Sequence, residues 1–323
     1  MSIHEPSDWR PSTICHVKKV YIAGHTGLVG SALVRNCDKN GVPWVGRRHS
    51  ELDLLNRDAV FDYIGTEKPS HVVVAAAKVG GIVANDSAPV EFLSENIRIA
   101  TNVIDASHAH NISRVLFLGS SCIYPRLSPQ PIREEYLLTG PLEPTNEAYA
   151  LAKISGLKLI QAYRRQYGHN WISAMPTNLY GPGDNFDLTS SHVLPATIRK
   201  FHEAKGTGAR EVVMWGTGSP MREFLHVDDL AEACMFLLRE YDDETCINVG
   251  TGTDITIREL AETVGRIVGY EGSIVWDETK PDGMPRKLLD VSKIRGLGWK
   301  HQYDLESGIH QVYDWYRSQP QNA

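Results

Sequence analysis

The chain has 323 residues, of which 42% are hydrophobic and 22% are charged, and its formal net charge is −6. This length and composition predict a globular protein of about two domains. The negative net charge argues against general binding to nucleic acid or to a membrane surface, and the apolar runs are too short to cross a bilayer.

The N-terminal segment and the cysteines suggest where the protein works. Residues 1–17 are polar, contain two prolines, and predict a loose tail rather than a signal peptide. The five cysteines are scattered and odd in number, without the spacing of a metal site. They fit free thiols in a reducing compartment. The sequence therefore predicts a cytoplasmic protein without a metal.

Short apolar runs alternate with longer helical patterns along the chain. Continuous apolar strands separated by helices are typical of a parallel sheet covered on both faces. The fold class predicted is therefore α/β with a doubly wound parallel sheet. The predicted strands lie at 20–24, 42–46, 71–77, 115–119, 171–176, 246–250 and 273–276.

A glycine-rich loop, GHTGLVGS, follows the first predicted strand and opens a helix. Its glycines are Gly24, Gly27 and Gly30, with Thr26 between them. Glycines let the turn close tightly and let backbone amides approach a pyrophosphate at the start of the helix. Ordinary turns also contain glycines, but this position between a strand and a helix favours dinucleotide binding.

The end of the second predicted strand indicates which dinucleotide binds. Arg47 and Arg48 stand where a carboxylate would hold the ribose of NADH. Two guanidiniums favour the additional phosphate of NADPH, although arginines on loops are usually solvated surface charge. Asp53 is a candidate adenine contact.

The fourth predicted strand ends in VLFLGSSCIYP, which places Ser120, Ser121 and Cys122 together. Most free cysteines are small buried hydrophobes. This cluster alone therefore leaves a structural and a catalytic interpretation of Cys122 open.

Tyr149 and Lys153 are four residues apart in a segment with helical periodicity, so they share one helix face. An ammonium beside the phenol is expected to lower the pKa of Tyr149 and to suit it as a proton donor to a carbonyl oxygen. Such pairs are common by chance. The glycine loop and Ser120 make a shared cofactor site the better interpretation.

GHTGLVGS, Ser120 and YALAK together resemble the extended short-chain dehydrogenase/reductases. Closer matches cover about nine-tenths of the chain and resemble the GDP-L-fucose synthase family, which epimerises and reduces GDP-4-keto-6-deoxy-D-mannose with NADPH. These matches include FLGSSCIYP, LEPTNEAYALAK, MPTNLYGPGDNF and WGTGSPMREFLHVDDLA.

The resemblance implies a role for particular residues. Cys122 and His192 would be the acid/base pair of epimerisation, and Ser120, Tyr149 and Lys153 would serve reduction. The implied nicotinamide-side contacts are Pro176, Asn178, Leu179, Lys153 and His192. The implied GDP-sugar contacts are Lys200, Trp215, Arg222, Asp282 and Lys287. The family often has a basic residue where Thr26 stands, which leaves more of the phosphate recognition to Arg47 and Arg48.

The resemblance implies a homodimer, and the order of segments along the chain predicts two interleaved domains. The NADP-binding Rossmann domain would comprise residues 18–180 and about 225–255, and the smaller GDP-sugar domain about 181–224 and 256–323. The segments 224–238 and 246–250 are expected to return to the main sheet.

Two other functions remain open. A sugar-nucleotide dehydratase, the nearest alternative among related epimerases and dehydratases, would need an acidic residue after the strand-end hydroxyl, where Cys122 and Ile123 stand. A non-catalytic NADP-sensing regulator would have no need to keep Ser120, Tyr149 and Lys153 together.

Overall fold

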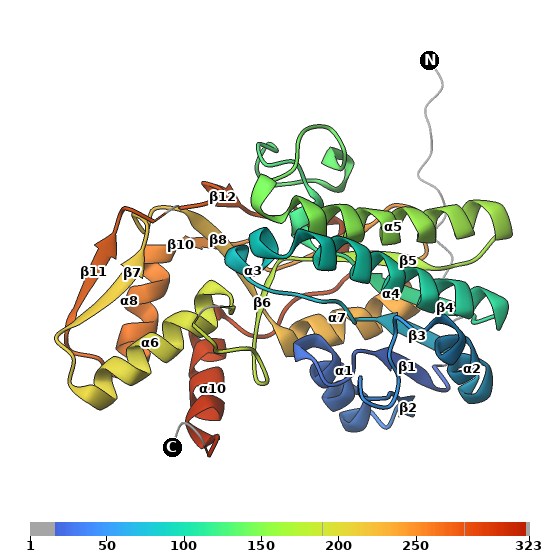
Figure 1. Ribbon diagram of the computed structural model, residues 1–323, viewed down its shortest axis with the longest axis horizontal. Coiled ribbons are helices and arrows are strands. Elements are labelled where there is room, and N and C mark those ends of the chain that lie inside the picture. Colours follow the sequence, from blue (N-terminus) through green and yellow to red (C-terminus); the bar gives the residue numbers. More distant parts are fainter. Residues whose placement is uncertain (1–16, 189, 281, 321–323) are drawn as a thin grey trace.

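The computed structural model describes residues 17–188, 190–280 and 282–320 (Figure 1). The predicted tail at 1–17 lies outside these residues except for Val17. The chain forms a larger lobe and a smaller lobe, and the smaller one lies to the left in Figure 1. No helix in the described ranges is both long and apolar enough to span a membrane.

The larger lobe is centred on a six-stranded sheet in the order β2-β1-β3-β4-β5-β9. All neighbouring strands run parallel. Its strands are β1 (Val20–Ala23), β2 (Trp44–Val45), β3 (His71–Val74), β4 (Arg114–Leu118), β5 (Ile172–Pro176) and β9 (Ile247–Val249). Most are short, apolar and fully buried because helices cover both faces. The predicted doubly wound α/β class is confirmed.

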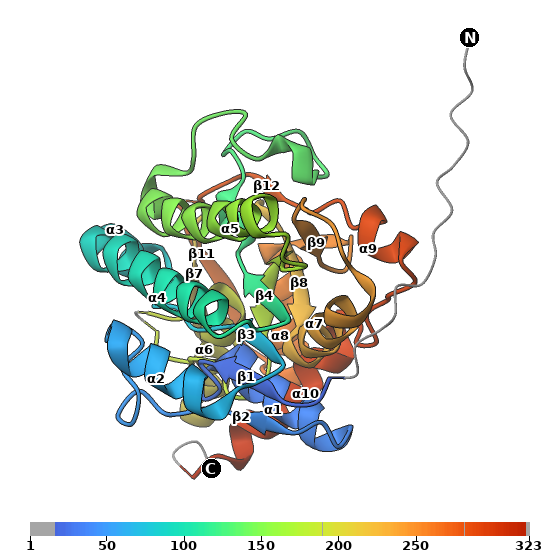
Figure 2. The same ribbon diagram turned by 90° about the vertical axis from the view of Figure 1, so that its right-hand side faces the viewer.

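The helices form two layers around this sheet (Figure 2). On one face, α4 (Pro89–Ala109) packs between α2 (Arg57–Glu67) and α5 (Glu147–Tyr167). On the other, α1 (Leu28–Lys39) packs against α7 (Val227–Glu240). Since β2 and β3 lie on opposite sides of β1, the direction in which successive strands are added to the sheet reverses at β1. Ligands of such sheets bind at this switch point, beyond the carboxyl ends of the strands.

The smaller lobe contains α6 (Val193–Thr207), α8 (Ile257–Val268) and α10 (Leu305–Ser318). It also has a mixed sheet in which β8 (Met221–His226) pairs with β6 (Asn178–Tyr180), β10 (Asp254–Thr256) and β12 (Arg286–Lys287). The remaining short elements are α3 (Ile82–Ser87), α9 (Ser292–Gly296) and the 3-10 turns η1 (Ser121–Ile123), η2 (Glu134–Tyr136) and η3 (Pro144–Asn146).

The structure adds the partner of one predicted strand and corrects the sheet assigned to another segment. The run at 273–276 forms β11 (Ser273–Asp277), but it pairs with β7 (Glu211–Trp215) in a separate two-stranded sheet. Residues 224–226 belong to β8 of the mixed sheet rather than to the main sheet. A short apolar run predicts a strand but not its partner. The segment at 247–249 does return to the edge of the main sheet, as predicted.

Each lobe has its own apolar core. The larger core includes the main strands and apolar residues of α7. The smaller core includes Leu194, Ile198 and Phe201 of α6 together with Leu260 of α8 and Ile309 of α10. The chain therefore passes from the first core to the second and back, although the exact residue boundaries of the two domains stay predictions.

Candidate active site

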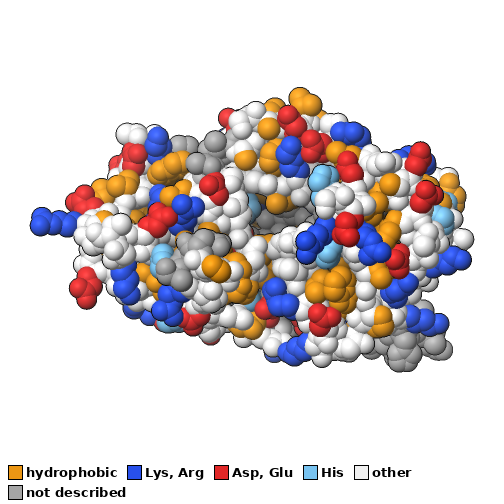
Figure 3. Space-filling view, turned by 60° about the horizontal axis from the view of Figure 1, so that its bottom comes forward, with side chains coloured by type: hydrophobic (Ala, Val, Ile, Leu, Met, Phe, Trp, Pro, Cys, Tyr) orange, Lys and Arg blue, Asp and Glu red, His pale blue; other side chains and the backbone are white. Residues whose placement is uncertain are grey.

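A cleft of about 950 Å³ is lined by residues of both lobes. Figure 3 shows a hollow in the middle of one face, with Lys, Arg and His side chains at its rim. Of the site residues predicted from the sequence, all but Arg48 line this cleft. They are Gly24, Thr26, Gly27, Gly30, Arg47, Asp53, Ser120, Cys122, Tyr149, Lys153, Pro176, Asn178, Leu179, His192, Lys200, Trp215, Arg222, Asp282 and Lys287.

The loop after β1 has the geometry that its glycines require. Gly24 has φ +87°, a left-handed conformation that favours glycine. A Cβ on Gly30 would lie 1.9 Å from the carbonyl oxygen of Gly24, so no larger residue fits there. Gly27 caps α1 without a side chain, and Thr26 beside it is exposed. This open helix start fits the pyrophosphate of a dinucleotide.

The two arginines after β2 differ in position. Arg47 lines the cleft, lies 5.2 Å from the centre of the Tyr63 ring, and has Nη2 3.6 Å from a carboxylate oxygen of Glu67. Arg48 is exposed and is not among the described residues that form the cleft wall. Asp53 lines the cleft and accepts the backbone N–H of Leu55 over 2.9 Å. Within the described residues, Arg47 therefore lines the cleft and Arg48 does not.

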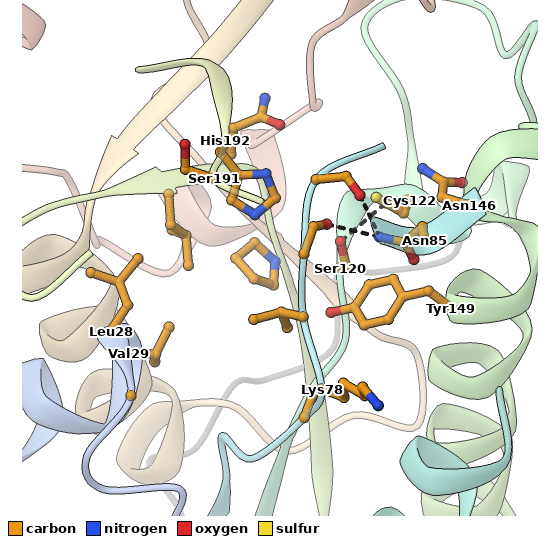
Figure 4. A pocket seen from close by; sticks show the side chains of 18 of the residues that line it. Leu28, Val29, Lys78, Asn85, Ser120, Cys122, Asn146, Tyr149, Ser191 and His192 are labelled. Atoms are coloured by element: carbon orange, nitrogen blue, oxygen red, sulfur yellow. Dashed lines mark hydrogen bonds between the residues drawn. The ribbon is translucent and has the colours of Figure 1, made fainter. Parts of the chain in front are cut away.

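The end of β4 delivers the serine and thiol cluster into the cleft (Figure 4). After Gly119 the chain turns into η1, where the Ser120 side chain accepts the backbone N–H of Cys122 over 3.3 Å. Ser120 and Cys122 line the cleft, and the thiol is partly buried. Ser121 is buried at 3% exposure and also reaches the wall.

The thiol of Cys122 has a cationic neighbour. Lys287 Nζ, from β12, donates to its Sγ over 3.3 Å. Burial raises the pKa of Cys122, but Lys287, hydrogen bonding with Ser120 and the charge of Arg222 together outweigh burial. The net pKa is below its ordinary value, which favours the reactive thiolate.

Tyr149 and Lys153 share a face of α5, as their spacing predicts, but Lys153 does not lower the pKa of Tyr149. Lys153 Nζ donates to the carbonyl oxygen of Leu118 over 2.8 Å and lies 5.7 Å from the centre of the Tyr149 ring. Burial lowers the pKa of Lys153 to about 8, despite the opposing charge of Cys122. Burial and the same charge raise the pKa of Tyr149. The expected lowering is therefore wrong, and Tyr149 keeps its proton at neutral pH.

His192 lies across the cleft from Cys122 and Tyr149 (Figure 4). It is the N-cap residue of α6, with φ −76° and ψ 166°, so its side chain projects from the start of the helix. Loss of contact with water lowers the pKa of the His192 imidazole, and the positive charge of Lys287 lowers it further. At neutral pH this favours the neutral ring, and any imidazolium formed is a stronger acid than usual.

The residues after β5 form the floor between the lobes. Pro176 is the last residue of β5, and Asn178 and Leu179 belong to β6. The Asn178 side-chain amide donates to the carbonyl oxygen of Glu223 over 2.8 Å, which fixes β6 against β8. These three residues line the cleft next to the loop of Gly24 and the end of β4.

The smaller lobe supplies the cationic and aromatic groups. Arg222 donates to the carbonyl oxygen of Met221 over 2.8 Å, and burial lowers its pKa against the opposing charge of Asp282. Lys200 Nζ lies 5.8 Å from the centre of the exposed Trp215 ring. The carboxylate of Asp282 accepts both the backbone N–H and the hydroxyl of Thr217 over 2.8 Å. Asp282 therefore fixes the loop after Trp215.

Three wall residues were missed from the sequence. Asn85 Oδ1, Asn146 Oδ1 and Ser191 Oγ are buried and have no hydrogen-bond partner among the described residues. Such groups are suited to bonding the hydroxyls of a ligand. Asn146 directly precedes the helix of Tyr149, and Ser191 directly precedes His192, so both stand next to a motif that the sequence does show, whereas Asn85 in α3 has no such neighbour. Within the described ranges no cluster could hold a metal ion.

Asp184, in the turn between β6 and α6, is a buried carboxyl that we expect to make folding stability dependent on pH. Its Oδ1 accepts the backbone N–H of Asn185 over 2.7 Å, whereas Oδ2 is buried without a partner among the described residues. Burial raises the pKa of this carboxyl to about 7. The folded state therefore holds a proton that the unfolded state loses near its ordinary pKa of 3.8.

In Asp184→Asn we expect the stability gain over the parent to grow with pH. The destabilisation by Asp184 is absent below its unfolded pKa of 3.8, increases as the pH rises, and is complete above its folded pKa of about 7. The gain should reach at most about 4 kcal/mol at high pH, because each unit of the difference between the folded and unfolded pKa is worth about 1.4 kcal/mol. Urea unfolding from about pH 5 to pH 8 measures it, with Asp62→Asn on the exposed side of α2 as control. A pH-independent difference between Asp184→Asn and the parent would contradict this account.

Comparison with known proteins gives a consistent result. Residues 20–250 match the model of the NAD dependent epimerase/dehydratase family. The chain is 57% identical over 299 residues to GDP-L-fucose synthase 1 of Arabidopsis thaliana, covering 92% of this chain and 93% of that one. It is 52% identical over 309 residues to GDP-L-fucose synthase of Escherichia coli (strain K12), covering 93% and 96%.

Solved structures agree with these sequence matches. A crystal structure of a GDP-L-fucose synthetase from Naegleria fowleri bound to NADP superposes with a TM-score of 0.87 at 28% identity. The superposition covers 97% of each chain.

Proposed function

The chain belongs to the NAD dependent epimerase/dehydratase family, and from this premise we propose that it converts GDP-4-keto-6-deoxy-D-mannose and NADPH to GDP-L-fucose and NADP⁺. Relatives at 52–57% identity over more than nine-tenths of the chain are GDP-L-fucose synthases. The structural observation that carries the proposal is the single cleft. It brings a thiol and an imidazole together with the serine, tyrosine and lysine of a reductase.

Epimerisation uses Cys122 and His192 on opposite sides of the sugar. The ketone acidifies the protons on its two flanking carbons. The Cys122 thiolate takes one such proton, which forms the S–H bond and leaves an enolate, and the His192 imidazolium gives a proton to the opposite face of that carbon. Exchange with water then restores both groups. The lowered pKa of Cys122 supports its role as the base, and the lowered pKa of His192 makes its imidazolium a strong proton donor once it has formed.

Reduction uses Ser120, Tyr149 and Lys153. NADPH, when bound, supplies the hydride for the carbonyl carbon. Ser120 donates a hydrogen bond to the carbonyl oxygen, and Tyr149 gives that oxygen its proton as negative charge develops. The raised pKa of Tyr149 keeps this proton available at neutral pH. Lys153 holds the ribose next to the nicotinamide.

The remaining wall residues bind the two nucleotides. We assign the cofactor to the glycine loop, Arg47 and Asp53 on one side and to Pro176, Asn178, Leu179, Lys153 and His192 on the other. The GDP-sugar lies against the smaller lobe, where Arg222 and Lys287 meet the diphosphate and Lys200, Trp215 and Asp282 frame the nucleoside. Cationic side chains are required because a diphosphate is strongly negative.

Arg47→Ala should narrow the preference for NADPH over NADH. Loss of a charged hydrogen bond to the 2′-phosphate should raise the KM for NADPH by about 10- to 100-fold, which corresponds to about 1.5–3 kcal/mol, and leave the KM for NADH nearly unchanged. Steady-state kinetics with both cofactors measure the change. Arg48→Ala is the matched control, because Arg48 lies outside the cleft wall of the described residues. A parent enzyme equally efficient with both cofactors would rule the assignment out.

We further propose a cytoplasmic homodimer. Helices α4 and α5 lie side by side on one face of the protein, and α5 exposes Leu151 and Tyr167 at 40% and 53%. Apolar side chains exposed along a helix pair suit association with a second copy. Cys37, Cys122, Cys234 and Cys246 are free thiols, which suits a reducing compartment. Sedimentation equilibrium measures the oligomeric state.

Product analysis tests the proposed function. The purified protein is incubated with NADPH and GDP-4-keto-6-deoxy-D-mannose, and the deoxyhexose is identified by NMR. We expect NADPH to be oxidised and GDP-L-fucose to form. A dehydratase would instead release water without net consumption of NADPH, and a regulator would bind NADPH without oxidising it.

A further inference from the structure

The side chains of Cys122 and Lys287 meet in the cleft although they lie 165 positions apart in the sequence. Cys122 follows β4 of the larger lobe, and Lys287 is the last residue of β12 in the mixed sheet. The ammonium nitrogen donates to the sulfur over 3.3 Å. This contact joins the two walls of the cleft at the atom to which we assign the role of base.

Lys287 is held at this point by its strand. In the parallel ladder of β12 and β8, Lys287 stands opposite Arg222, and the charges of both residues act on the Cys122 thiol. Lys287 is only 7% exposed. Within the described part of the chain, its ammonium donates a hydrogen bond to the Cys122 sulfur.

A buried ammonium without a negative partner is costly. The sulfur of Cys122 can supply that partner only as a thiolate, because a neutral thiol is a weak acceptor. The backbone adds a further constraint, since Ser120 accepts the N–H of Cys122 and fixes the turn that presents the sulfur. The geometry therefore favours an ion pair between the Cys122 thiolate and the Lys287 ammonium over a neutral thiol beside the same ammonium.

We propose that Lys287 is a positioning residue that holds Cys122 as a thiolate, so that the base of epimerisation is already formed before the substrate binds. This inference rests on the proposed function for its role in catalysis, but the ion pair itself needs neither substrate nor cofactor. Lys287 therefore has two roles: it contacts the diphosphate of the substrate, and it stabilises the thiolate of Cys122.

The ammonium of Lys287 also acts on the second residue of the acid/base pair. Lys287, Cys122 and His192 all line the cleft, and the positive charge of Lys287 lowers the pKa of His192 as well as that of Cys122.

Other ionisable groups around the thiol do not replace Lys287. Arg222 from β8 also favours the thiolate, but its guanidinium donates to the carbonyl oxygen of Met221. Lys153 and Tyr149 from α5 interact electrostatically with Cys122, and the Lys153 ammonium is bonded to the carbonyl oxygen of Leu118. Lys287 is the cation in hydrogen-bond contact with the sulfur.

The pH dependence of Cys122 alkylation tests the pair. The full-length protein, without ligands, reacts with iodoacetamide from about pH 5 to pH 10, and mass spectrometry follows the peptide that contains Cys122. In Lys287→Met the midpoint should rise by at least about one pH unit, so that the rate at neutral pH falls about tenfold. Lys287→Arg, which keeps the charge, should retain most of the parental rate. Lys280→Met, at an exposed lysine beside Trp215, should leave the midpoint unchanged.

If Lys287 only contacted the diphosphate of the substrate, its substitution would leave the alkylation midpoint of Cys122 unchanged. Equal midpoints in the parent and in Lys287→Met would overturn the proposal, and the neutral variant Lys287→Gln provides the same comparison with the parent should Lys287→Met fail to fold. With substrate present, exchange of the flanking protons in Lys287→Met should recover as the pH rises, because the thiolate then forms unaided. A raised KM without recovery at high pH would show that Lys287 only binds the diphosphate. A shifted midpoint in a protein that makes no GDP-L-fucose would uphold the pair and refute the proposed function.

Discussion

Tyr149→Phe is expected to lose NADPH oxidation almost completely while still exchanging the protons next to the ketone. Removal of the phenolic hydroxyl deprives the carbonyl oxygen of its proton donor, and a general acid typically contributes about 10²- to 10⁴-fold to the rate. Exchange needs only the base and the acidified carbons, so it should persist. The raised pKa of Tyr149 supports a role in reduction and not in proton removal, because the phenol keeps its proton at neutral pH and can donate it to the carbonyl oxygen.

Two measurements separate these effects in Tyr149→Phe. Stopped-flow absorbance follows NADPH, and NMR in heavy water follows the loss of the flanking protons. Tyr163→Phe on the same helix is a suitable control, because Tyr163 bonds Asp105 away from the cleft. NADPH oxidation at the parental rate in Tyr149→Phe would mean that another residue is the acid.

Cys122→Ser should abolish exchange and inversion while the protein stays folded and binds NADPH. Serine is close to cysteine in volume, so the turn after β4 is preserved. A hydroxyl is far less acidic than a thiol and gives Lys287 no anionic partner. We expect exchange to fall by about 10²- to 10⁴-fold, the usual contribution of a general base. With NADPH present, slow reduction of the unepimerised ketone should give a deoxyhexose other than fucose.

His192→Asn provides the counterpart to Cys122→Ser. Because removal and return of the proton use different groups, this variant should retain some exchange and lose inversion. The cleft geometry supports the distinction, since His192 and Cys122 lie on opposite sides of it. Normal exchange and normal fucose stereochemistry in Cys122→Ser would return the thiol to the role of a buried hydrophobe.

Much of the fold could be predicted from the sequence because its signals are local. The apolar strands and the glycine loop predict the doubly wound sheet and its ligand edge, and the loop at Gly24 has the left-handed backbone that its glycine permits. The motif residues also meet in one cleft, because the carboxyl ends of parallel strands share an edge. Their assigned roles stay predictions.

The rest depends on contacts that sequence spacing does not encode. The partner of β11 is β7 and lies in a separate sheet, because a short apolar run carries no information on pairing. The pKa of Tyr149 is set by burial rather than by its helix neighbour Lys153. Lys287 reaches Cys122 through the pairing of β12 with β8, which only the tertiary structure shows.

The isotope pattern of the product tests the central claim most directly, because it reports both reactions in one molecule. The parent enzyme is incubated in heavy water with GDP-4-keto-6-deoxy-D-mannose and unlabelled NADPH, and the product is analysed by NMR. We predict GDP-L-fucose with deuterium on both carbons that flanked the ketone and with ordinary hydrogen on the former carbonyl carbon. A reduced product that carries no solvent deuterium on either flanking carbon would contradict an enzyme that epimerises and reduces in this cleft.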